Sequence, residues 1–124
     1  MAVTSGYVLS GIIASAIIFI GARFLLAPYV AAAGFGVAVP PGTVADAYLS
    51  VKGIRDIAFG LIAAILIVSQ SAHLLGWFML AAAIIPLADA AIVLRHGGTK
   101  ATTFGIHGAT AVVMLITSAL LLLG

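Results

Sequence analysis

Residues 74–94 read LLGWFMLAAAIIPLADAAIVL, an uninterrupted apolar run in which Asp89 is the single charged side chain. The run matches the ~20 residues with which an α-helix crosses the hydrocarbon core of a bilayer. Backbone groups inside lipid must be hydrogen-bonded within the protein, and the run shows no alternation of apolar and polar residues. It therefore predicts a membrane-spanning helix rather than a barrel strand.

Three further apolar runs have a similar length and cover about 7–26, 44–69 and 101–123. Only short polar connections separate the second run from the third and the third from the fourth. Short connections make neighbouring helices antiparallel. The sequence therefore predicts an all-α membrane protein, a single domain over 1–124 built as an antiparallel four-helix transmembrane bundle.

The connection over 28–43 differs from the others because it is long and rich in proline and glycine. Such a composition breaks helices and favours turns. Yet residues 30–39 are otherwise apolar. We therefore expect this loop to lie in the membrane interface or to fold back over the mouth of the bundle.

The composition excludes several classes of protein. Hydrophobic residues make up 65% of the chain and charged residues only 6%, against about 25% in a soluble domain. Five basic side chains in all make no nucleic-acid footprint. The chain has no cysteine and no metal-binding histidine motif, so the sequence predicts neither a metal nor another cofactor.

The charged side chains gather at one end of the predicted bundle. The end of the first helix, the start of the second, the end of the third and the start of the fourth share one side of the membrane. An excess of Lys and Arg marks the cytoplasmic side. We therefore expect a multi-pass cell-membrane protein whose charged side is cytoplasmic and whose termini are both outside. Arg95 and Lys100 lie at the rim and are expected to anchor the helices there.

Some ionisable residues lie too deep to be anchors. At 1.5 Å per residue, Asp56 is roughly 18 Å along its helix from Val44, and Asp89 and His107 are about 8–9 Å inside theirs. Ionisable side chains at such depth are costly and indicate function. Pro86, one turn before Asp89, removes a helical hydrogen bond and predicts a kink that could open a cavity.

Helical spacing groups several of these residues on one face of the second helix. Steps of three and four place side chains on the same face, which we expect to point into the bundle because lipid does not accept it. The residues in this series are Tyr48, Lys52, Arg55, Asp56 and Phe59.

Four strings of this chain resemble a known family. They are FIGARFLLAP (19–28), YLSVKGIRDIAFGL (48–61), PLADAAIVLRHGG (86–98) and GIHG (105–108). They resemble a family of small four-helix membrane proteins of bacteria and fungi, catalogued as a domain of unknown function (number 4267) and similar to the DoxX-like membrane proteins. The resemblance implies a four-helix membrane fold. Its fungal members imply a link to membrane-embedded enzymes that open epoxides in polyketide pathways.

Two carboxyls in unlike surroundings can act as an acid and a base. If Arg55 pairs with either Asp56 or Asp89, that carboxyl stays ionised and the other can donate a proton. This Asp-Arg-Asp arrangement resembles that of soluble limonene epoxide hydrolases, although the fold is unrelated. Tyr48 and His107 would hydrogen-bond the epoxide oxygen, and Lys52, Arg23 and Phe59 would contact the substrate.

We therefore expect a membrane-embedded enzyme that opens a lipophilic epoxide by hydrolysis or cyclisation, with the substrate arriving sideways from the lipid. Two alternatives remain open. The protein could be a proton-coupled small-molecule transporter, which would need a homodimer because one chain holds no inverted repeat. It could also be a non-catalytic accessory subunit that binds a membrane lipid.

Overall fold

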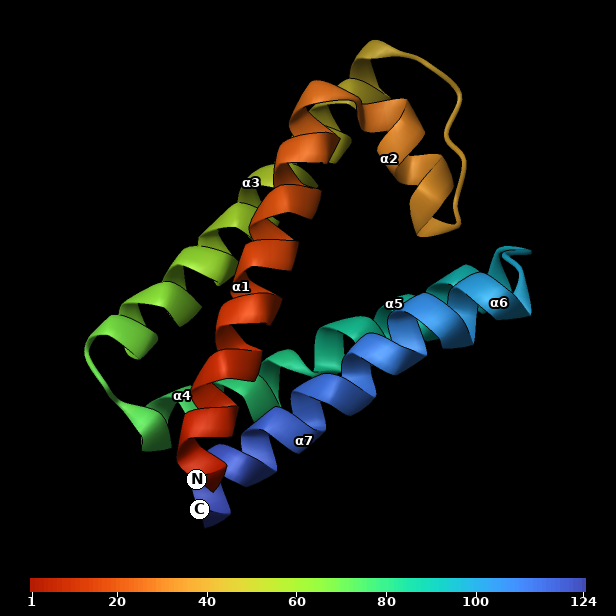
Figure 1. Ribbon diagram of the computed structural model, residues 1–124. Coiled ribbons are helices and arrows are strands. Elements are labelled where there is room, and N and C mark those ends of the chain that lie inside the picture. Colours follow the sequence, from red (N-terminus) through yellow and green to blue (C-terminus); the bar gives the residue numbers. More distant parts are fainter.

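The computed structural model describes all 124 residues, and its regular secondary structure is entirely helical (Figure 1). The all-α prediction is therefore confirmed. The elements in chain order are α1 (Ala2–Leu26), α2 (Pro28–Phe35), α3 (Thr43–Val68), α4 (Ala72–Ala82), α5 (Ile84–Arg95), α6 (Lys100–Thr102), the π-helical η1 (Thr103–Gly108) and α7 (Ala109–Leu123).

Three segments are long and apolar enough to cross a membrane: Ala2–Leu26, Ala72–Arg95 and Lys100–Leu123. The sequence predicted four. The helix that differs is α3, which has 26 residues but carries four charged side chains between Asp46 and Asp56. Only 25 of the 124 residues are buried, and large hydrophobic side chains cover much of the outside. Such a surface suits lipid rather than water.

The helices form two antiparallel pairs that meet at the end holding both termini and diverge from there (Figure 1). One pair is α1 with α3, and the other is α4–α5 with α7. At the closed end a core joins the pairs, with Ala14 of α1 and Ala63 of α3 packed together with Leu75, Met79 and Leu121. Within the second pair, Ser118 donates a hydrogen bond of 2.9 Å to the Gly76 carbonyl. The bundle is therefore a wedge, closed at the termini and open at the other end.

Glycines let α1 and α3 approach closely. A Cβ at Gly21 would lie 2.5 Å from the carbonyl oxygen of Gly53, and a Cβ at Gly60 would lie 2.9 Å from that of Ala14. Membrane helices gain van der Waals contact in this way, because lipid provides no hydrophobic force to press them together. The same contacts fix which side of α3 faces inward.

The connection over 28–43 contains a helix that the sequence did not predict, so the fold is not simply a four-helix bundle. Pro28 stands at the first position of α2, where its missing N–H costs no hydrogen bond. Gly36 ends the helix with a left-handed φ of 113°, a conformation that favours glycine. The segment folds back across the open end of the wedge (Figure 1), as expected.

The helix that was predicted over 74–94 is interrupted. It begins at Ala72, α4 ends at Ala82 and α5 begins at Ile84. Pro86 lacks the N–H that would bond the carbonyl of Ala82, which explains the break at this place. The loss of a helical hydrogen bond that Pro86 predicted is thus seen as an interruption between two helices. The fourth predicted helix also departs from regular geometry, because residues 103–108 form the π-helical turn η1.

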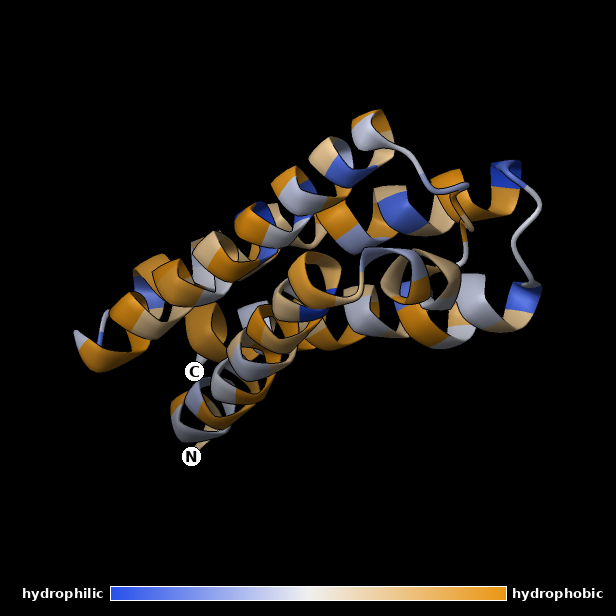
Figure 2. Ribbon diagram, turned by 90° about the horizontal axis from the view of Figure 1, so that it is seen from above, coloured by the Kyte–Doolittle hydropathy of each residue, from blue (hydrophilic) through white to orange (hydrophobic).

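Figure 2 shows hydrophobic residues along most of each helix and hydrophilic ones mainly toward the end opposite the termini. The predicted separation of charge from the closed end is visible in this view. The open end of the wedge is therefore also the polar end.

The contact between α1 and α3 can be tested at Gly21. Gly21→Ala should lower the thermal unfolding midpoint in neutral detergent, because overpacking against a backbone carbonyl costs about 1–3 kcal/mol. The matched control is Gly11→Ala on the same helix, where no atom lies within 4 Å of the added carbon. That variant should be neutral or slightly stabilised. Equal midpoints for the two variants would contradict the close approach.

Candidate functional site

A cavity of about 610 Å³ lies in the wedge between the two helix pairs. Its volume is that of a typical small-molecule site. Of its 28 lining residues, 19 are hydrophobic, so the walls are mainly apolar. The ionisable residues on the walls are Arg23, Lys52, Asp56, Asp89 and His107.

The cavity reaches the outer surface between α1 and η1–α7. Ile12 and Ile20 of α1 and Ile106 and Val113 of the facing segment line it, and all four are also exposed. The opening is therefore bordered by apolar side chains on the flank of the bundle. Such a border would face lipid acyl chains if α1 and α7 span the bilayer.

An ion pair on α3 is the central polar contact of the cavity. Lys52 Nζ lies 2.8 Å from Asp56 Oδ2, one helical turn away. The ammonium also lies 4.5 Å from the ring centre of Phe24 and 4.8 Å from that of Phe35. Opposite charge and aromatic faces both stabilise a desolvated cation. Lys52 therefore takes the place that the sequence assigned to Arg55.

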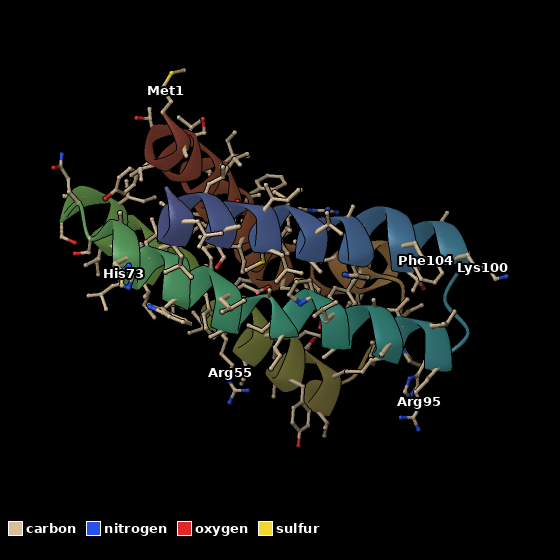
Figure 3. All side chains as sticks on the ribbon, turned by 90° about the horizontal axis from the view of Figure 1, so that it is seen from below. Met1, Arg55, His73, Arg95, Lys100 and Phe104 are labelled. Carbon is tan, nitrogen blue, oxygen red and sulfur yellow. The ribbon has the colours of Figure 1, made fainter.

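The structure corrects the predicted positions of Tyr48 and Arg55. Both are exposed, and Figure 3 shows Arg55 pointing away from the bundle. The inward direction of α3 is set by Gly53 and Gly60, which pack against α1. Tyr48 and Arg55 lie at the edge of the predicted face that is remote from these glycines. Spacing alone grouped the five residues but could not give the helix rotation.

Asp89 lies on α5, and its carboxyl differs from that of Asp56. It lines the same cavity and is within electrostatic range of Lys52, Asp56 and His107. The only ion pair of the chain is Lys52–Asp56, so Asp89 has no cation partner. The two carboxyls are thus brought to one cavity with unlike partners.

His107 is held by a contact that crosses the wedge. Its Nε2 lies 2.7 Å from the backbone carbonyl oxygen of Phe35, so Nε2–H is the donor, and the two rings lie 4.4 Å apart. Nδ1 is therefore the ring nitrogen that remains for the predicted hydrogen bond with a substrate. The π-helical turn that carries it is a geometry common at functional sites.

The opposite end of α2 is tied to the start of α3. The Tyr29 hydroxyl donates to the Asp46 carboxylate and accepts the Gly42 N–H at 3.1 Å. The hydrogen bond to Asp46 raises the pKa of the Tyr29 phenol above its ordinary value, although the contact with the Gly42 backbone lowers it in part. Asp46 thus holds α2 over the open end instead of joining the cavity.

The comparisons with known proteins identify a family and little else. The family described as "Domain of unknown function (DUF4267)" matches residues 14–121. The chain belongs to this family. No curated protein and no solved structure matches the sequence. The range that matches DUF4267 contains every ionisable residue of the cavity.

In this DUF4267 chain, six of the eight predicted site residues line the cavity. They are Arg23, Lys52, Asp56, Phe59, Asp89 and His107. Sequence reasoning missed Phe24 and Phe35, which surround the Lys52 ammonium. Phe24 stands three residues after Gly21, so its place beside the α1–α3 contact was a usable signal. Phe35 lies in α2, and no local pattern predicted its position.

Proposed function

We propose that this DUF4267 protein is a membrane-embedded enzyme that performs acid–base chemistry on a lipophilic small molecule, and that the reaction opens an epoxide. One observation supports this most strongly. A single, mainly apolar cavity holds two carboxyls with unlike partners, Asp56 beside Lys52 and Asp89 without a cation. Pairs of this kind can divide the roles of base and acid.

The proposal includes a membrane arrangement. The chain spans the bilayer four times, because α3 crosses it in addition to the three long apolar segments. The short helix α2 lies at the charged side. The inward placement of the neutralised Lys52–Asp56 pair supports this, because two of the four charged side chains of α3 are then kept from lipid. Arg55 can extend its guanidinium toward the interface. The excess of Lys and Arg makes the charged side cytoplasmic, which leaves both termini outside.

This arrangement can be tested by cysteine labelling, because the chain has no native cysteine. The exposed positions Ala38, Ser69 and Thr99 are each changed to cysteine, and intact cells receive a membrane-impermeant maleimide. Ser69→Cys should be labelled in intact cells, and Ala38→Cys and Thr99→Cys only after lysis. Labelling of Ala38→Cys together with Ser69→Cys in intact cells would show that α3 does not span.

The proposed reaction uses the two carboxyls from opposite sides of the substrate. The Asp56 carboxylate takes a proton from a water molecule as the water oxygen attacks an epoxide carbon. The ring carbon–oxygen bond breaks, and Asp89 in its acid form gives its proton to the departing oxygen. The product is a vicinal diol, and transfer of a proton from Asp56 to Asp89 restores the starting state. In a cyclisation, a hydroxyl of the substrate replaces the water.

The partners of the two carboxyls support this division of roles. An adjacent ammonium favours the ionised form of a carboxyl, which a base requires. A carboxyl on an apolar wall without a cation suits the acid. Access also fits, because the apolar opening between α1 and η1–α7 lets a lipophilic substrate enter from the membrane.

The role of the carboxyls is tested with a lipophilic epoxide, the methyl ester of epoxystearic acid, in detergent micelles. Asp56→Asn and Asp89→Asn should each reduce diol formation by about 100-fold or more, because acid–base groups contribute 10²–10⁴-fold. Size-exclusion chromatography checks that each variant is folded. Asp46→Asn is the matched control, since Asp46 lies outside the cavity and asparagine still accepts the Tyr29 hydrogen bond. Arg55→Gln should also retain turnover.

Retained turnover in both Asp56→Asn and Asp89→Asn would remove the claim. Movement of the epoxide across proteoliposomes without any diol would instead assign the cavity to transport.

A further inference from the structure

The basic side chains on the cavity wall differ in whether another group of the chain already pairs with them. Lys52 is paired with Asp56, and the Nε2–H of His107 is donated to the Phe35 carbonyl. Arg23 also lines the cavity but pairs with no carboxylate, because the chain has one ion pair and Arg23 is not in it. The wall therefore presents one guanidinium that is free to bind an anion.

The position of Arg23 along the wedge follows from the register of α1 and α3. Gly21 lies against Gly53, and Ala14 lies against Gly60. A Cβ at Gly21 would also lie 3.0 Å from the Asp56 Cβ, so Asp56 packs beside Gly21, two residues before Arg23. At a rise of 1.5 Å per residue, Arg23 is roughly 3 Å nearer the charged end than Gly21 and the Asp56 carboxyl beside it. Arg23 is exposed, which places it at the rim of the cavity.

Below this rim the cavity is lined by apolar side chains. Ile17, Phe59 and Phe78 belong to three different helices and line it beyond the level of the ion pair, and the two phenylalanine rings pack 6.1 Å apart. The order from the charged end inward is thus a free guanidinium, a pair of carboxyls and an apolar chamber.

We infer that the cavity binds a single-chain amphiphile with an anionic head, which pairs with Arg23 while the chain lies along the carboxyls and in the apolar chamber. A guanidinium matches a carboxylate with two parallel hydrogen bonds. The volume of about 610 Å³ is within the range for one small ligand. This inference rests on the proposed function for its reactive group, the epoxide, which would lie a short run of methylenes from the head.

Binding of stearic acid and of its uncharged methyl ester tests this recognition without any turnover. Both are measured on the purified full-length protein in neutral detergent. The native protein should bind the acid about tenfold or more tightly than the ester, because only the acid can form a charged, hydrogen-bonded pair with the guanidinium. Arg23→Gln should lose this preference and keep the native affinity for the ester. Lys100→Gln removes an exposed cation outside the cavity and should keep the preference.

Two outcomes would overturn the inference: no preference for the acid in the native protein, or an unchanged preference in Arg23→Gln. The latter would mean that Arg23 only anchors α1 in the interface. A third arm uses phosphatidylglycerol, an anionic lipid with two chains, as a competitor. It should displace stearic acid poorly, and efficient displacement would overturn the single-chain part of the inference.

The recognition and the chemistry can fail separately. If the native protein prefers the acid through Arg23 but opens neither epoxystearic acid nor its ester, the recognition stands and the proposed reaction falls. If turnover depends on Asp56 and Asp89 while Arg23→Gln leaves the acid preference unchanged, the reaction stands and the recognition falls.

Discussion

The ion pair between Lys52 and Asp56 is the interaction on which the rest of the structure depends. The pair is partly buried, and removing either partner would leave the other charge uncompensated on a mainly apolar wall, so both side chains are held on the inner side of α3. The close glycine contacts with α1 direct that side toward the wedge. The rings of Phe24 and Phe35 then surround the ammonium, which draws α2 across the open end.

Much of the fold and of the candidate site could be predicted from the sequence, because these features depend on local properties of each helix. Four apolar runs gave the long helices, Pro86 gave the interruption, and depth along a helix distinguished Asp56 and Asp89 from the rim. Helix rotation could not be predicted, because it depends on which face of α3 packs against α1. The prediction therefore chose Arg55 over Lys52, although both lie within a turn of Asp56. The sequence did not predict α2, because the proline and glycine at its ends indicated a loop where eight residues are helical.

The departure from a plain four-helix bundle is what makes room for a ligand. Two helix pairs joined only at the terminal end would leave the other end open, and α2 bridges it through Phe35 and His107. The cavity that results has a polar rim, two carboxyls with different partners and an apolar interior. The ionisable groups of the cavity occupy one end of the bundle, which is the arrangement on which the proposed chemistry on an amphiphile rests.

The central claim is that the Asp56 and Asp89 carboxyls have unlike partners and therefore unlike roles, as base and as acid. A lipophilic carbodiimide tests this claim most directly. Dicyclohexylcarbodiimide partitions into membranes and reacts with carboxyl groups in their neutral form. Peptide mass spectrometry of the labelled protein in liposomes should find the adduct on Asp89, and on Asp56 only after Lys52→Met. Labelling of Asp56 as fast as Asp89 in the native protein, or no labelling of Asp89, would contradict the account.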